Sequence, residues 1–307
     1  MKLRLCRHDV AVLGSIADFR VLGMRHLAAL HQRGVQVLRR RARALGTMGL
    51  VQITPRGIGE RRGRPEGLVS LTEEGVDLLK ARGVLHPDMP GERVTAEGLS
   101  CLDHHLLVNE FRMQWVLMGR AMPELTVRFL SPTSPLACSS DGRPVIREGV
   151  DPRDGIEEQV GFTPDGAALV THSRLGKSLL FFLEADMGTE TVASRQRSKE
   201  DVRQKVHNYQ TYFRSEGYRR YEGIWGCRFR GFRLLVVASS PARLAALCRL
   251  VRRMPPSDFV WLTDQGNLLS QGTWAPIWAR GGRLDAPLQS ILGNQMPLPT
   301  PTPASLM

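Results

Sequence analysis

Residues 34–79 constrain the fold most, because helix-like and strand-like patterns alternate there around a loop rich in glycine and arginine. The segment opens with GVQVLRRRARALGTMGL, whose apolar residues recur at steps of three and four and so share one side of a helix. Gly46 and Gly49 end this helix, and residues 50–53 alternate like a strand. The loop PRGIGERRGRPEG leads to a second strand, LVSL, and then to a helix with Thr72 as its N-cap. The pattern predicts a small α+β unit.

Basic residues gather on two parts of this unit. The solvent-facing side of the first helix carries Gln36, Arg39, Arg40 and Arg43. The loop between the strands carries Arg56, Arg61, Arg62 and Arg64. With two more short helices expected at residues 9–19 and 23–31, the order resembles a winged helix, whose arginine-faced helix enters the major groove of double-stranded DNA while the wing holds phosphate or the minor groove. The alternative is an α+β domain whose arginines are only a solvated face.

The net charge favours a polyanionic partner. The chain carries a formal charge of +12 and a pI of about 10.2. Residues 1–80 hold 15 Lys/Arg against 7 Asp/Glu, or +8, and the rest of the chain holds only +4. Because the basic surplus follows the winged-helix pattern, nucleic acid is the expected partner rather than any acidic surface.

Cysteine usage and hydropathy indicate the compartment. The five cysteines are odd in number, widely spaced and without a C-x-x-C pair, so they favour neither a disulfide framework nor a zinc ribbon. A reducing cytoplasm is the simple expectation. No apolar run is long enough for a signal peptide or a membrane span, so we expect a cytoplasmic protein without a membrane partner.

A length of 307 residues allows two domains. We expect the winged helix at residues 1–80, a Gly- and Pro-rich linker at 81–100, an α/β domain at 101–290 and a disordered tail at 291–307. Within the α/β domain, the patterns predict in turn a helix, a strand, a hairpin, a helix, a strand, a helix and a strand, over residues 101–122, 125–130, 167–184, 194–215, 233–238, 241–253 and 258–262. Residues 131–161 predict a loop, with one strand near Val145.

Three acids mark the hairpin as a chemical site. Glu184 and Asp186 are two apart on one strand, so their carboxylates share a face, and Asp165 begins the partner strand. A tight turn centred on residues 175–176 would place Asp165 opposite Asp186 and diagonal to Glu184. Three converging carboxylates would hold Mg²⁺ or Mn²⁺, which could assist phosphodiester cleavage. The alternative is a solvated sheet edge, but the acids interrupt an apolar run, FFLEADMGTE, where charges persist only if something pairs with them.

Five motifs occur in the order expected of one family. The N-terminal winged helix is followed by HHLLVNEFR, PDGAALV, FFLEADMGTET and KVHNYQTYF, and together they resemble the bacterial replication-relaxation family over residues 9–261. Members are associated with replication and relaxation of plasmids and other mobile DNA, and MobC-type relaxases are similar. The resemblance implies an α+β winged helix followed by an α/β restriction-endonuclease-like domain. It also implies that Asp165, Glu184 and Asp186 match metal-binding acids, with Glu110 matching an acid of the first helix.

The sequence departs from the endonuclease pattern at one position. That pattern places a lysine two residues after the glutamate, where this chain has Asp186. Lys205 on the next helix would replace it, or is a surface lysine. For a relaxase nucleophile, Tyr212 is the candidate because it lies off the side of its helix on which Tyr209 is expected to pack against the sheet. His104 and His105 are expected to pack a helix rather than to bind metal.

Two functions remain open from the sequence. The first is a DNA-binding protein of plasmid or mobile-element replication or relaxation, with a second domain that is a Mg²⁺-dependent nickase or an inactive binding platform. It would act on double-stranded DNA, with other replication or mobilisation proteins or a second copy as further partners. The alternative is a winged-helix transcriptional regulator whose inactive nuclease-like domain serves dimerisation or sensing.

Overall fold

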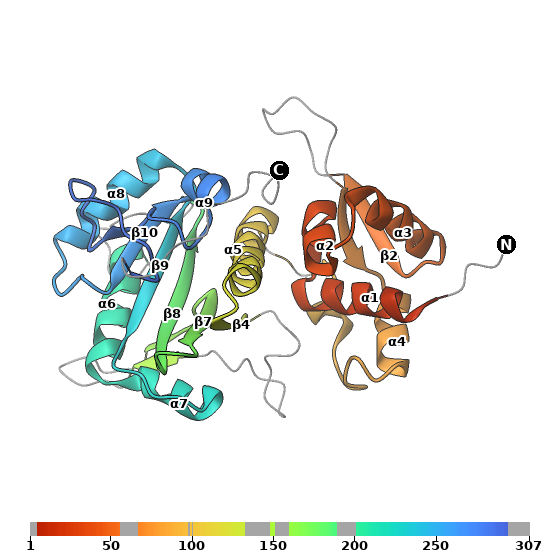
Figure 1. The fold of residues 1–307 in the computed structure, drawn as a ribbon, viewed down its shortest axis with the longest axis horizontal. Helices are drawn as coiled ribbons and strands as arrows, with labels where there is room; N and C mark the ends of the chain where they lie inside the picture. The colour runs from red at the N-terminus through yellow and green to blue at the C-terminus, as the bar shows by residue number, and fades with distance from the viewer. Residues whose placement is uncertain are drawn as a thin grey trace. The chain divides into compact units, whose positions relative to one another are not determined.

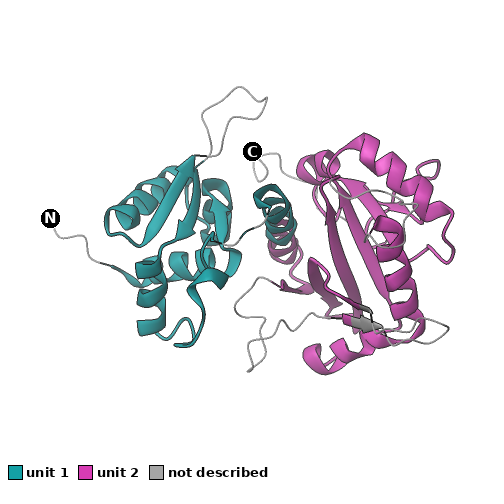
Figure 2. Cartoon of the chain, turned by 180° about the vertical axis from the view of Figure 1, so that it is seen from behind, with its two compact units in different colours: residues 1–113, 133–144, 307 teal, residues 114–132, 145–306 magenta. Residues whose placement is uncertain are grey.

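The computed structural model describes residues 5–55, 67–97, 99, 101–132, 148–150, 160–188 and 201–293. Described residues up to Met113 form one compact unit, and those from Gln114 onward form a second (Figure 2). The boundary falls within helix α5 (Leu102–Ala121), which contributes its first half to unit 1 and its second half to unit 2. Both units mix helices with sheet. Along the described ranges, no helix is both long and apolar enough to cross a membrane.

Unit 1 packs helices onto a small antiparallel sheet with the strand order β1-β3-β2. Its elements are α1 (Arg7–Phe19), β1 (Val21–Gly23), α2 (Met24–His31), α3 (Val35–Thr47), β2 (Val51–Pro55), β3 (Gly67–Leu71), α4 (Glu73–Ala81) and the 3₁₀ helix η1 (Gly91–Arg93). The apolar stripe of α3 is buried in the core through Leu38, Ala42 and Leu45, as its periodicity predicts. The predicted cap of α4 is confirmed, because Thr72 Oγ1 accepts a hydrogen bond from the Gly75 N–H at 3.2 Å.

The linker predicted for residues 81–100 is wrong. Leu85 and Val94 are buried in the same core as α1 and α3. The Arg20 guanidinium donates to the carbonyl oxygens of Thr95 and Glu92, at 2.9 and 2.7 Å. Gly and Pro in this segment therefore signal irregular backbone rather than an absence of packing. The short strand β1 was also not predicted, because three residues are too few to show a period.

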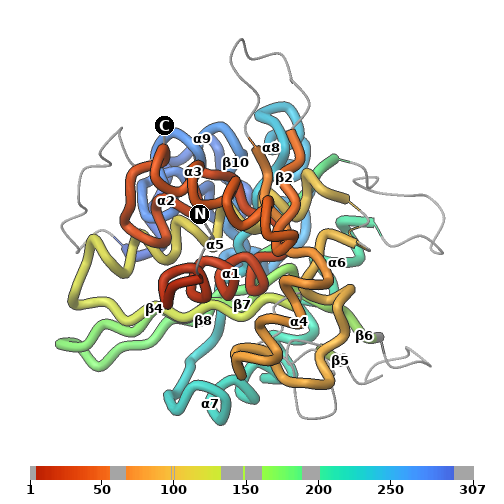
Figure 3. The backbone as a smooth tube through the Cα atoms, turned by 90° about the vertical axis from the view of Figure 1, so that its right-hand side faces the viewer, coloured from red at the N-terminus to blue at the C-terminus, as the bar shows by residue number. Residues whose placement is uncertain are grey.

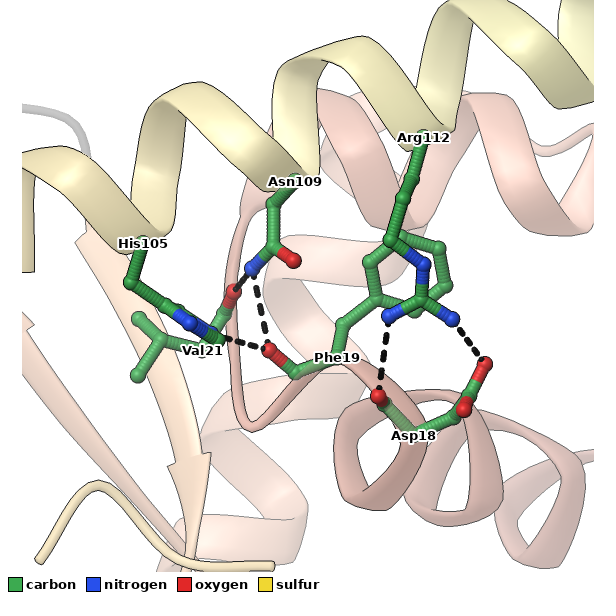
Figure 4. Close-up of polar contacts among 6 residues, drawn as sticks. All are labelled: Asp18, Phe19, Val21, His105, Asn109 and Arg112. Carbon is green, nitrogen blue, oxygen red and sulfur yellow. Dashed lines mark hydrogen bonds and ion pairs between the residues drawn. The ribbon is translucent and has the colours of Figure 1, made fainter. Parts of the chain in front are cut away.

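The first half of α5 holds the corner between α1 and β1 (Figure 4). His105 Nε2 and Asn109 Nδ2 both donate to the Phe19 carbonyl oxygen, at 2.7 and 2.9 Å. Arg112 donates to the Asp18 carboxylate at 2.7 Å and lies over the Phe19 ring, 3.9 Å from its centroid. Burial lowers the pKa of His105 to about 4, so a neutral ring with one N–H makes this contact. The expectation that His105 packs a helix is confirmed.

Unit 2 is built on a six-stranded sheet with the order β11-β10-β9-β8-β7-β4. Its elements after α5 are β4 (Leu125–Leu130), β5 (Glu148–Val150), β6 (Val160–Phe162), β7 (Gly166–His172), β8 (Lys177–Asp186), α6 (Val202–Arg214), η3 (Gly217–Arg219), α7 (Arg220–Trp225), β9 (Phe232–Ala238), α8 (Pro241–Arg252), β10 (Val260–Asp264), α9 (Gln265–Gln271) and β11 (Ala279–Arg280). Strands β4, β7 and β8 form an antiparallel meander, visible side by side in Figure 3, and β8, β9 and β10 are parallel. The predicted α/β order is confirmed from α5 to β10.

Helices cover both faces of this sheet. Helices α6 and α8 lie on one face and the second half of α5 on the other (Figure 1). The alternation of β8 follows from this: Leu180 and Phe182 join the core with α6, whereas Phe181 meets Trp115 of α5 with ring centroids 5.4 Å apart. By the same alternation, Glu184 and Asp186 at the end of β8 share the face covered by α6.

Several elements of unit 2 were not predicted. Strands β6 and β11 and helices α7 and α9 are short, so their periodicity is too brief to detect. The strand expected near Val145 corresponds to β5, which begins at Glu148, while Val145 itself lies outside the described residues. The tail predicted for residues 291–307 is wrong at its start, because Ile291 is buried and its carbonyl oxygen accepts a hydrogen bond from Arg233. Residues 294–307 lie outside the described residues.

Candidate nucleic-acid interface and acidic hairpin

Helix α3 turns a basic face to solvent. Gln36, Arg40 and Arg43 are exposed on the side opposite the buried stripe. Arg39 is half-buried, and its NH1 donates to Gln36 Oε1 at 3.3 Å. Arg40 and Arg43 form no ion pair with any residue that the structure describes. Both are therefore available to a polyanion, as the sequence predicts for this helix.

Arg41, one residue further on, is held instead by the protein. Its guanidinium makes a bidentate ion pair with Asp9 of α1, whose side chain is fully buried. The Cys6 backbone N–H donates to the same carboxylate at 2.6 Å. Burial of the carboxylate opposes ionisation, but the hydrogen bonds from Arg41 and Cys6 outweigh it and lower the pKa of Asp9 to about 2. The pair fixes α3 against α1, and sequence periodicity gave no signal for it.

The arginines predicted for the wing belong to the loop between β2 and β3. Arg56, Arg61, Arg62 and Arg64 lie outside the described residues, which resume at Gly67. The strands on either side are described, and their last pair joins Pro55 to Gly67. The loop thus connects two adjacent antiparallel strands, as the sequence predicts.

The acidic hairpin has a different register from the one predicted. His172 pairs with Lys177, so four residues form the turn and Gly176 closes it with a positive φ of 58°. Continuing the register places Asp165 opposite Glu184, not opposite Asp186 as expected. Because the difference is two residues, both acids keep the predicted face. Asp165 Oδ2 also accepts from the Ala185 N–H at 2.8 Å, which ties the two strand ends together.

Glu184 lies between two residues of α6. The Tyr209 hydroxyl donates to Glu184 Oε1 at 2.6 Å, and Lys205 Nζ lies 3.5 Å from Glu184 Oε2. Burial, followed by the negative charges of Glu184 and Asp165, raises the pKa of Tyr209 well above its usual value. Two carboxylates, a lysine and a neutral phenol therefore gather at this end of β8. Tyr209 packs against the sheet, as predicted.

Asp186 is bound elsewhere. Its two carboxylate oxygens accept from Arg243 Nε and NH2 of α8, at 2.8 and 2.9 Å. The Gly188 N–H donates to it as well, at 2.7 Å. Arg243 was not singled out from the sequence, because the two residues are far apart in the chain. This pairing explains how an acid persists where the endonuclease pattern has a lysine.

The predicted metal cluster does not form as expected. Across the described ranges, no three His, Cys, Asp or Glu side chains are arranged to hold a metal ion. Asp186 is engaged by Arg243, and Glu110 belongs to unit 1, where its Oε2 lies 2.8 Å from His26 Nε2. Of the four predicted acids, Asp165 and Glu184 come to opposite positions when the β7–β8 register is extended, and both lie near Tyr209. Mg²⁺ prefers carboxylate oxygens and takes its other ligands from water and phosphate, so these two acids are the residues that would hold such an ion.

The expectation that Tyr212 lies off the packed face of α6 is also wrong. Its side chain is 1% exposed, and its hydroxyl donates to Glu148 of β5. Glu148, itself buried, accepts from the Tyr221 hydroxyl at 2.7 Å and pairs with Arg220 at 3.1 Å. Burial and the Glu148 charge raise the pKa of Tyr212. A buried phenol that resists ionisation is unsuited to attack DNA. The sequence predicts a loop at Glu148, and no pattern there indicates that this acid is buried or bonded.

A comparison with protein families matches most of the chain to one family model. The family model for replication-relaxation matches residues 13–226, which run from within α1 to just beyond the end of α7. The chain therefore belongs to the replication-relaxation family. No curated protein matches it. Membership points to a role in the replication or relaxation of mobile elements.

Proposed function

We propose that this member of the replication-relaxation family binds double-stranded DNA through a winged helix in unit 1, in the replication or relaxation of a plasmid or other mobile element. Arg40 and Arg43 of α3 carry the proposal, because they are exposed and have no ion-pair partner among the residues that the structure describes. An unpaired basic helix face is complementary to the phosphates that line the major groove.

The surroundings of α3 support this assignment. Helices α1, α2 and α3 are followed by the β2–β3 hairpin, and β1 completes the sheet, which is the order a winged helix requires. The Asp9–Arg41 ion pair fixes α3 on α1, so the exposed face is presented from a rigid support. The hairpin loop contains the arginines expected of a wing.

DNA binding by titration at several salt concentrations tests the proposal. Arg40→Ala/Arg43→Ala should weaken binding to random duplex DNA and lower the salt slope by about 2, because each lost phosphate contact removes about 0.9. Arg82→Ala removes an exposed arginine at the C-cap of α4 and is the matched control. Equal affinity of wild type and double variant at low salt would exclude α3 as the DNA-binding helix.

A second candidate function is metal-dependent nicking by unit 2. Helix α5, the β4–β7–β8 meander, helix α6 and parallel strand β9 follow the order of the endonuclease-like domain implied by the family resemblance. Asp165 and Glu184 would hold a Mg²⁺ or Mn²⁺ ion, which stabilises charge on phosphate oxygens when bound. Tyr209 orients Glu184 through its hydrogen bond, and Lys205 adds positive charge beside it.

Relaxation of supercoiled plasmid with and without Mg²⁺ or Mn²⁺ tests this candidate. Metal-dependent nicking should be lost in Glu184→Gln and retained in Asp285→Asn, which removes an exposed acid paired with Arg252. Plasmid that stays supercoiled with wild-type protein would exclude nicking under these conditions. Binding by unit 1 would then favour the platform or transcriptional-regulator alternative.

A further inference from the structure

Val37 is an anomaly on the basic face of α3. Its side chain is 48% exposed, and in this fully described helix it is the one large apolar side chain turned to solvent. Arg40, three residues further along the helix, is exposed, and Arg41, four residues along, is bound to Asp9. Gln36 beside it in the chain and Arg33 just before the helix are also exposed. Val37 lies in the first turns of the helix, the part of a recognition helix that reaches base edges.

The surrounding charge narrows what Val37 can contact. A partner that binds this face must place an apolar group on Val37 and negative charge around it. A protein would need an apolar residue ringed by acids, whereas the major groove of DNA offers base edges flanked by phosphates. In that groove thymine alone presents an apolar group, its C5-methyl. Valine in a helix has one preferred χ1 rotamer, so its methyl groups are already positioned for such a contact.

We infer that Val37 selects for thymine by packing against its C5-methyl group, which makes it a specificity-determining residue of the DNA site. The inference rests on the proposed function and deepens it. The arginines supply affinity that does not depend on sequence, and Val37 supplies discrimination at one base pair. Gln36, which Arg39 orients, is adjacent but reads by hydrogen bonds, so it does not respond to a methyl group.

The test removes one methyl group from the DNA. Preferred sites are first selected from random duplexes with the full-length protein, and each thymine is then replaced in turn by deoxyuridine. At one position the replacement should raise the wild-type Kd about fourfold, the effect of one buried methyl group. Val37→Ala should bind the thymine site as weakly as wild type binds the deoxyuridine site, and should not respond to the replacement. Gln36→Ala, the matched control, should keep the fourfold response.

Four results would overturn the inference: no preferred site, no sensitive thymine, an equal response in Val37→Ala, or a change in oligomeric state in Val37→Ala with unchanged DNA binding. If Arg40→Ala/Arg43→Ala still weakens binding to random DNA in those cases, the DNA-binding function stands and only the role of Val37 fails. If wild type does not bind random DNA at low salt, both fail. Because Val37 is exposed, Val37→Ala should keep the wild-type melting temperature.

Discussion

Helix α3 and the end of strand β8 both concentrate charge, but two arginines of α3 are exposed, whereas the carboxylates of β8 are largely buried and paired. Arg40 and Arg43 are exposed and unpaired within the described residues. Glu184 and Asp186 are only 12% and 9% exposed, and both have cationic partners from helices packed on the same face. Exposed unpaired charge attracts a polyanion at little cost, whereas partly buried charge persists because the protein compensates it.

The same contrast occurs between two consecutive residues of α3. Arg40 faces solvent, while Arg41 is bound to buried Asp9. Two arginines that are equivalent in the sequence are therefore expected to differ in function, one for DNA and one for stability. Substitution of one arginine at a time tests whether an ion pair within the protein decides if an arginine serves stability or DNA binding.

The largest effect is expected at the buried ion pair of unit 1. Asp9→Asn leaves the Arg41 guanidinium without its anion, and breaking a buried pair costs about 3 kcal/mol. Denaturant unfolding should show this loss of stability. Arg40→Ala, on the exposed face of the same helix, should stay within about 0.5 kcal/mol of wild type. Equal losses in the two variants would contradict the division of roles within α3.

The same pair predicts a pH dependence. The hydrogen bonds from Arg41 and Cys6 hold the pKa of Asp9 at about 2 in the folded protein, below the 3.8 that is usual for an aspartate, so the carboxylate contributes stability that is fully present above about pH 4. As the pH falls from about 4 to about 2, roughly 2 kcal/mol should be lost in wild type. Unfolding of Asp9→Asn over this range should lack that component. A parallel pH profile for the two proteins would show that Asp9 is not the titrating group.

The next effect concerns the acid that replaces the expected lysine. Arg243→Met leaves Asp186 largely buried, with the Gly188 N–H as its remaining side-chain partner among the described residues, and should destabilise unit 2 by about 2 kcal/mol. Asp186→Asn/Arg243→Met should recover part of this loss, because no uncompensated charge remains. Urea unfolding of the two variants checks the coupling. A double variant no more stable than Arg243→Met would contradict it.

Sequence patterns predicted the parts of the fold that depend on local periodicity. The stripe of α3, the Thr72 cap and the strands of the hairpin all follow from neighbouring residues. Residues 81–100 were misassigned because Gly and Pro report backbone shape, whereas packing of Leu85 depends on contacts distant in the chain.

For the acidic site at the end of β8, the sequence predicted which residues lie on the face covered by α6. It did not predict the partners of Asp186 and Tyr212. The predicted proximity of Glu184 and Lys205 is confirmed by their ion pair. It could be predicted because strand alternation and position on a helix are local properties of the sequence. Arg243 and Glu148 were missed, because their partners are separated from them by 57 and 64 residues. The predicted hairpin register was wrong because it centred the turn on residues 175–176. In the structure Gly176 is the last of four turn residues, a position that the sequence alone does not indicate.

A smaller effect should separate a metal site from a closed ion pair. If Asp165 and Glu184 bind Mg²⁺, a concentration ten times the Kd should stabilise unit 2 by roughly 1.4 kcal/mol, seen as a higher melting temperature. Asp165→Asn should abolish the shift. Lys205→Met should enlarge it, because Glu184 then lacks its cationic neighbour. If Mg²⁺ shifts the melting temperature of neither the wild type nor Lys205→Met, Asp165 and Glu184 do not bind the ion. The Glu184–Lys205 ion pair would then be a structural contact of unit 2.

The smallest effect is expected at Tyr212. Tyr212→Phe removes one of three side-chain partners of Glu148, and the Tyr221 hydroxyl and Arg220 remain. The loss should be about 1 kcal/mol, the ordinary net value of one hydrogen bond. Any plasmid relaxation by the wild type should persist in this variant, because the buried hydroxyl serves packing rather than attack on DNA. Relaxation that disappears in Tyr212→Phe while the melting temperature stays near wild type would restore Tyr212 as a nucleophile and would require unit 2 to open at α6.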